Sequence, residues 1–124
     1  MLIIDANAIL RYMLNDNVEM ANKVHDLIGN TIVNIRYEVM AEVVYVLDNV
    51  YSLPRNEIAE GIKVFLSLPN VKNESNEVLS LALETYANRN MDFVDSILYA
   101  LKAIYGYDVF TFDKKLISMI NKLS

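Results

Sequence analysis

The chain has 124 residues, a formal net charge of −5 and no cysteine. These values fit one compact domain without disulfides, exclude a thiolate metal site and argue against a strongly basic nucleic-acid-binding surface. The hydrophobic fraction of 54% supports a sizeable core, and no apolar run approaches the ~20 residues that cross a bilayer, so we expect a cytoplasmic protein.

The first half of the chain alternates short apolar segments with helical patterns. Residues 2–4 predict a strand buried on both faces, and a helix follows directly. Residues 18–29 predict a second helix. Residues 31–35 are rich in β-branched side chains and predict a second strand. From residue 37 to about residue 50 an apolar stripe at helical spacing predicts a third helix.

The second half continues the alternation. Pro54 marks the first turn of a helix, and Gly106 ends another. Helices are predicted over residues 54–68, 75–88, 93–105 and 114–123. Residues 71–74 and 108–112 predict a third and a fourth strand. The pattern indicates a single α/β domain over residues 1–124, with a short, mostly parallel central sheet of four to five strands flanked by about seven helices.

Four acidic residues in apolar surroundings follow a strand or lie near the start of a helix. They are Asp5, Glu42, Asp95 and Asp113. Because ligands gather at the carboxyl ends of parallel strands, we expect these acids to lie at one edge of the sheet. A buried carboxylate needs a partner cation, a hydrogen-bond network or a metal. Bound Mg²⁺ or Mn²⁺ is the simplest common explanation, and phosphodiester hydrolysis is frequent work for such a site.

Each acid also has a simpler interpretation. Asp113 is a good helix cap, and alone this role is favoured over catalysis. Asp95 suits the first turn of a helix through the helix dipole alone. Glu42 is the hardest to explain otherwise, because apolar residues flank it within a helix.

Other polar and aromatic residues also have more than one interpretation. Arg11 and Arg36 are placed to reach a scissile phosphate or a partner's carboxylate, and surface ion pairs are the alternative. His25 is the only histidine, so we expect a solvated or packed role for it. The helical tyrosines, Tyr99 among them, are assigned to core or dimer packing rather than to base stacking.

Four motifs in this order resemble those of the PIN domain, a small Mg²⁺-dependent nuclease fold, and within it the VapC-type ribonuclease toxins. They are IIDANAILRY, VMAEVVYVL, DFVDSILYAL and FTFDKKL. The resemblance implies that the four acids hold Mg²⁺ or Mn²⁺ and are catalytic. It assigns supporting roles to Asn7 after the first acid, to the hydroxyl of Thr111, and to Asp92, for which a helix N-cap is the alternative.

The resemblance further implies a toxin of a toxin–antitoxin pair that cleaves structured RNA such as tRNA or rRNA. It also implies a homodimer and a cognate antitoxin that blocks the site. The alternatives are a PIN-fold nuclease outside such a pair, active in RNA processing, and a non-catalytic PIN scaffold. A receiver-type signalling domain is disfavoured because no acceptor aspartate follows the second strand. A haloacid-dehalogenase-type phosphatase is disfavoured because Asn7 stands where a second aspartate is needed.

Overall fold

A computed structural model of the chain describes residues 1–123. The chain divides into two compact units, one of residues Met1–Glu74 and one that begins at Ser75. Each unit has its own helices and its own set of buried apolar side chains.

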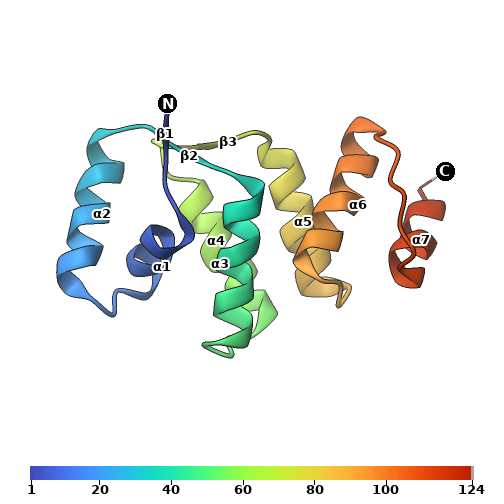
Figure 1. Ribbon diagram of the computed structural model, residues 1–124, viewed down its shortest axis with the longest axis horizontal. Helices are drawn as coiled ribbons and strands as arrows, with labels where there is room; N and C mark the ends of the chain where they lie inside the picture. Colours follow the sequence, from blue (N-terminus) through green and yellow to red (C-terminus); the bar gives the residue numbers. More distant parts are fainter. Residues whose placement is uncertain (124) are drawn as a thin grey trace. The chain divides into compact units, whose positions relative to one another are not determined.

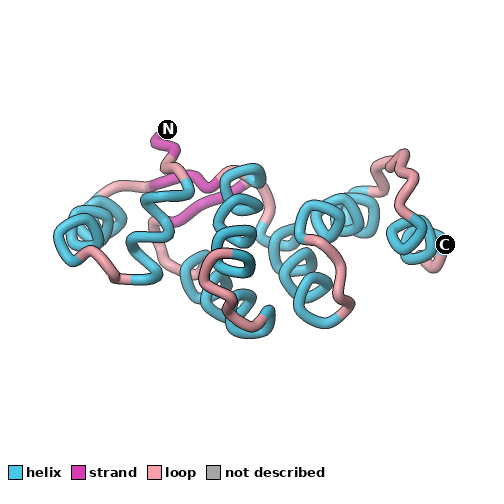
Figure 2. Tube along the Cα trace, turned by 60° about the horizontal axis from the view of Figure 1, so that its bottom comes forward, coloured by secondary structure: helices cyan, strands magenta, loops and turns pink. Residues whose placement is uncertain are grey.

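The first unit contains three short strands and four helices. The strands are β1 (Leu2–Ile3), β2 (Val33–Ile35) and β3 (Val71–Asn73), and the helices are α1 (Ala6–Leu14), α2 (Val18–Asn30), α3 (Tyr37–Asn49) and α4 (Arg55–Leu66). The strands, magenta in Figure 2, pair in the order β1-β2-β3, and both pairs are parallel. Val33 and Ile35 of the central strand are buried.

The first strand differs from its prediction. Leu2 and Ile3 are 38% and 52% exposed, so β1 is not buried on both faces. The reason is its place in the sheet, because β1 is an edge strand that pairs only with β2.

Polar side chains and proline set the helix starts in this unit. Asp5 accepts a hydrogen bond from the N–H of Ala8 at 2.9 Å, and Asn17 accepts one from the N–H of Met20 at 3.0 Å. These bonds satisfy N–H groups that the first turn of a helix leaves without a partner. Pro54 stands directly before α4, where it has no backbone N–H to leave unpaired.

The core of the first unit lies where its helices face one another and the strands. Helix α1 packs against α2 and α3, and α3 packs against α4 (Figure 1). Each helix turns one apolar face inward. The largest fully buried side chains here are Ile9, Val33, Ile35, Met40, Leu47, Ile58, Ile62 and Phe65. Packing of these apolar faces therefore stabilises the helices, in addition to the caps at their starts.

The second unit contains three helices, α5 (Asn76–Asn88), α6 (Phe93–Tyr105) and α7 (Lys114–Asn121). The Ser75 hydroxyl caps α5 by accepting from the N–H of Val78 at 3.2 Å. Gly106 ends α6 with a φ of 72°, a left-handed conformation that glycine adopts without strain. Helix α6 packs along α5 and also contacts α7 (Figure 1).

The fourth predicted strand is wrong. Residues 108–112 have no ladder partner in the described structure and run as irregular backbone before α7. Val109 packs against the buried cluster of Met91, Leu116 and Met119. Phe110 and Phe112 are each 87% exposed. Of the apolar side chains whose alternation predicted a strand, only that of Val109 packs inward, and the backbone of this segment does not pair with a strand in the described structure.

The seven predicted helices and the parallel sheet are confirmed within residues 1–123, but the sheet has three strands rather than four to five. None of the described helices combines the length and the apolarity needed to span a bilayer.

Candidate functional site

Asp5 lies between the end of β1 and the first turn of α1. Its side chain is exposed and caps α1 through the N–H of Ala8. Asn7, predicted as a supporting residue, is also exposed in the first turn of the same helix. One carboxylate oxygen of Asp5 is engaged as a cap, so the carboxylate keeps further lone pairs for a cation or a substrate.

Glu42 lies in the second turn of α3, the helix that follows β2. Its side chain is exposed, whereas Val43 and Val44 beside it are buried. Asp5 and Glu42 therefore follow neighbouring parallel strands, and the helices that carry or follow them pack together. The apolar neighbours of Glu42 form the inner face of α3, and Glu42 itself belongs to the outer face.

The expected burial of the acids is wrong for three of them. Asp5, Glu42 and Asp113 are exposed, and only Asp95 is half-buried. The sequence pattern misled because helices and their caps place polar side chains outward next to buried apolar ones. The cost of burial therefore does not by itself require a metal at the three exposed carboxylates.

Asp95 is the acid whose environment is electrostatically unusual. It lies in the first turn of α6. Burial raises the pKa of the Asp95 carboxyl above its ordinary value, and the negative charges of Asp113 and then Asp92 raise this pKa further. The structure thus brings three predicted acids of the second unit into one electrostatic group. Mutual repulsion of this kind is relieved by a bound cation.

Asp113 is held by two local hydrogen bonds. Its side chain accepts from the N–H of Leu116 at 2.8 Å and so caps α7. Its own backbone N–H donates to the Thr111 hydroxyl at 3.0 Å. Thr111 thus contacts the backbone of Asp113, and its supporting role stays a prediction. Asp92 lies at the N-cap position of α6, but its side chain makes no cap hydrogen bond.

The two candidate arginines are both engaged in ion pairs. Arg11 contacts Asp16 at 2.9 Å. Arg36 contacts Glu38 at 3.0 Å. The pKa of Glu38 is lowered by its own backbone N–H and by the Arg36 guanidinium, so this pair is favourable. The ion-pair alternative is therefore the one that the structure supports for both arginines.

The acids of the second unit offer the hard oxygen donors that Mg²⁺ and Mn²⁺ prefer. Across residues 1–123, no three acidic or histidine side chains lie close enough together to hold a cation. Mg²⁺, however, usually keeps several waters and binds through only one or two carboxylates. Asp95 and Asp113, whose charges interact, would be the carboxylates of the second unit to hold such an ion.

The comparison with protein families identifies the family of the chain. Residues 2–121 match the family described as PIN domain. The chain belongs to the PIN-domain family. This confirms the PIN-domain prediction made from the four sequence motifs. No curated protein and no solved structure matches the chain.

PIN domains are generally nucleases, and these nucleases usually use Mg²⁺ or Mn²⁺. The family match therefore supports a nuclease-type function for this PIN domain. All four candidate acids lie within the matched residues.

This PIN domain also holds a groove that the sequence analysis missed, lined by Tyr99 and Arg89 among others. Tyr99 was assigned to packing, and Arg89 was not singled out. The available signal was spacing, because Tyr99 follows Asp95 by four residues and so lies on the same face of α6.

Replacing Asp95 with asparagine is expected to stabilise the metal-free protein. The raised pKa means that folding disfavours the ionised carboxyl, so the destabilisation is present at neutral pH and vanishes below the ordinary value of 3.8. In EDTA at pH 7 we expect Asp95→Asn to raise the melting temperature by about one to three degrees, the shift of a change below about 1 kcal/mol.

The gain in melting temperature should shrink as the pH falls, because Asp95 becomes protonated in the wild type. Asp26→Asn on α2 is the matched control, since Asp26 is an exposed carboxylate of the first unit. Thermal melts followed by circular dichroism at several pH values measure the melting temperatures of Asp95→Asn and Asp26→Asn. A gain that is the same at every pH, or a loss at pH 7, would show that neither burial of the ionised Asp95 carboxyl nor repulsion by its acidic neighbours is the cause.

Proposed function

We propose that this PIN domain is an endoribonuclease that depends on Mg²⁺ or Mn²⁺, with Asp5, Glu42, Asp95 and Asp113 as its catalytic and metal-binding acids. The observation that carries the proposal is the family match over residues 2–121, because PIN domains are generally nucleases. The electrostatic coupling of Asp95 with Asp113 supports it independently, because such a pair favours a bound cation.

The protein's own residues have defined roles in this proposal. Asp95 and Asp113 supply negatively charged oxygens, and the cap on α7 together with Thr111 fixes the direction of Asp113. Asn7 and Asp92 have supporting roles beside Asp5 and Asp95. A bound Mg²⁺ or Mn²⁺ supplies Lewis-acid activation of a phosphoryl oxygen and a more acidic water for attack on phosphorus.

Cleavage of RNA by the purified chain tests the proposal. We expect cleavage with Mg²⁺ or Mn²⁺, its loss with excess EDTA, and its return when the metal is restored. A 5′-labelled RNA with blocked ends distinguishes internal cutting from trimming. Cleavage that persists in excess chelator would overturn the metal dependence. If the chain cuts no RNA and millimolar metal does not change its melting temperature, the protein is instead a non-catalytic PIN scaffold.

We further propose that the protein is the toxin of a toxin–antitoxin pair, acts in the cytoplasm and cleaves structured RNA such as tRNA or rRNA. The support is the resemblance of its four motifs to VapC-type toxins. A homodimer and a cognate antitoxin belong to the same proposal, and both would cover exposed apolar side chains such as those of Phe110 and Phe112. Growth arrest on expression, relieved by the product of an adjacent reading frame, tests this role. Expression without any effect on growth would favour a nuclease of RNA processing.

A further inference from the structure

The second unit carries a groove lined by residues of α5, α6 and α7, and its α6 residue, Tyr99, lies on the same helix face as Asp95. The groove has a volume of about 240 Å³ and is open to solvent. Residues four apart on a helix lie one above the other, so Tyr99 in the groove is one turn from Asp95. This volume is below the ~300–1,000 Å³ of pockets for drug-sized ligands. The groove therefore suits a single ring system rather than a larger ligand.

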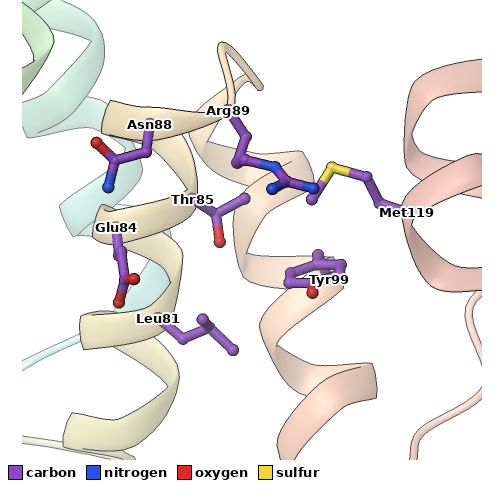
Figure 3. A pocket seen from close by; sticks show the side chains of 7 residues that line it. All are labelled: Leu81, Glu84, Thr85, Asn88, Arg89, Tyr99 and Met119. Atoms are coloured by element: carbon purple, nitrogen blue, oxygen red, sulfur yellow. The ribbon is translucent and has the colours of Figure 1, made fainter. Parts of the chain in front are cut away.

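The lining of the groove combines an aromatic ring with hydrogen-bonding groups. The ring of Tyr99 is half-buried. Figure 3 shows this ring on α6, with Thr85 of α5 facing it and Glu84 and Asn88 farther along the α5 side of the groove. Met119 of α7 adds an apolar, polarisable wall. Unpaired bases are held in proteins by stacking on aromatic rings and by hydrogen bonds to their edges. The groove offers both kinds of contact.

Positive charge lies at one end of this groove. Arg89 is exposed at the end of α5, and its side chain projects toward α7 in Figure 3. No acidic side chain in the described part of the chain forms an ion pair with it. Lys115 lies nearby, because its Nζ donates to the carbonyl oxygen of Asn90 at 2.8 Å. In a chain of net charge −5, two cations gathered here favour a phosphate.

We infer that the groove binds one unpaired nucleotide of the RNA substrate, with the base on Tyr99 and a phosphate at Arg89. The inference rests on the proposed nuclease function, because it places this nucleotide one helical turn from Asp95. The groove then selects single-stranded segments over paired ones, since a base must leave its stack to enter it. Glu84 accepts hydrogen bonds only, so it favours bases that carry an exocyclic amino group.

Binding measured without cleavage tests the groove. The probe is a short fluorescein-labelled adenylate oligonucleotide, either single-stranded or annealed to its complement, titrated with the full chain in EDTA and followed by anisotropy. We expect tighter binding of the single strand. Tyr99→Leu should weaken this binding about tenfold, because it removes the stacking surface. Arg89→Gln should weaken it and lower the slope of log affinity against log salt by about one, because one phosphate contact is lost.

Matched variants separate binding from folding. Tyr99 also packs against the buried cluster of Met91, Leu116 and Met119, so Tyr99→Phe, which keeps the ring, should bind like the wild type. Tyr105→Leu removes an exposed ring from the same helix outside the groove. Lys72→Gln in β3 makes the same charge change as Arg89→Gln in the first unit. Neither Tyr105→Leu nor Lys72→Gln should change the affinity for the single strand, or the slope of log affinity against log salt, by more than about twofold.

These experiments distinguish an incorrect assignment of the groove from an incorrect assignment of the nuclease function. If the wild type cleaves RNA with Mg²⁺ but Tyr99→Leu and Arg89→Gln keep its affinity, the groove does not bind the nucleotide. The same conclusion follows if the wild type prefers the duplex or binds neither probe. If the groove variants lose affinity while the wild type cuts no RNA with any metal, the groove binds RNA and the proposed nuclease function fails.

Discussion

Asp113→Asn and Asp5→Asn should each lower the rate of metal-dependent RNA cleavage by roughly a thousandfold or more. A bound metal contributes several kcal/mol of charge stabilisation in the transition state, and each ~1.4 kcal/mol is worth about tenfold in rate. Asparagine keeps the shape of aspartate but loses the negative charge that holds a cation. Single-turnover cleavage of a labelled RNA in Mg²⁺ measures the effect.

The change from aspartate to asparagine distinguishes a catalytic role of Asp113 and Asp5 from a role in helix capping. Asp113 accepts from the N–H of Leu116 and Asp5 accepts from the N–H of Ala8, so both are helix caps in the structure. Asparagine caps a helix about as well as aspartate. Neither variant should therefore melt below the wild type, although cleavage is lost. In EDTA the Asp113→Asn variant should melt slightly higher, because the charge of Asp113 no longer raises the pKa of Asp95. A role as a cap alone predicts that activity is kept.

The control for both variants is Asp26→Asn on α2, an exposed carboxylate to which we assign no functional role. It should cleave RNA at the wild-type rate. If Asp113→Asn and Asp5→Asn also retain nearly full activity, these residues are caps and the assignment of the catalytic acids is wrong.

Ile62→Ala should lower the free energy of unfolding by about 2–5 kcal/mol, the usual cost of truncating a fully buried aliphatic side chain. Ile62 lies on the inner face of α4 and has no exposed surface. Its removal leaves a cavity as well as losing buried apolar area. A stability of about 5–15 kcal/mol is usual for a domain, so the loss is a large part of the total.

Val64→Ala on the same helix is the matched comparison, because Val64 is 65% exposed. It should change the free energy of unfolding by about 0.5 kcal/mol or less. Urea denaturation followed by circular dichroism measures both variants. Equal losses for the two would mean that the inner face of α4 is not the one that carries Ile62.

Helix positions could be predicted closely from the sequence because their signals are local. Asn17 and Ser75 cap the starts of α2 and α5, Pro54 precedes α4, and Gly106 ends α6. The residue types at these positions therefore predict the bounds of the helices. The parallel strands were also predictable, since short apolar segments alternate with helices.

Strand pairing and exposure could not be predicted in the same way. Residues 108–112 have the composition of a strand, but a strand also needs a neighbour, which no local pattern supplies. The exposure of Glu42 was missed because the sequence around it is apolar, whereas the helix directs Val43 inward and Glu42 outward. The interaction of Asp95 with Asp113 joins α6 to the N-cap of α7, and only the packing of those helices reveals it.

Binding of Mn²⁺ followed by electron paramagnetic resonance tests the central claim most directly, because it needs no RNA substrate. We predict that the wild type binds Mn²⁺, that Mg²⁺ competes for it, and that Asp95→Asn and Asp113→Asn each weaken the binding at least about tenfold. Asp26→Asn should bind Mn²⁺ as the wild type does. Equal Mn²⁺ affinity in the wild type and in both acid variants would contradict a metal site at these carboxylates.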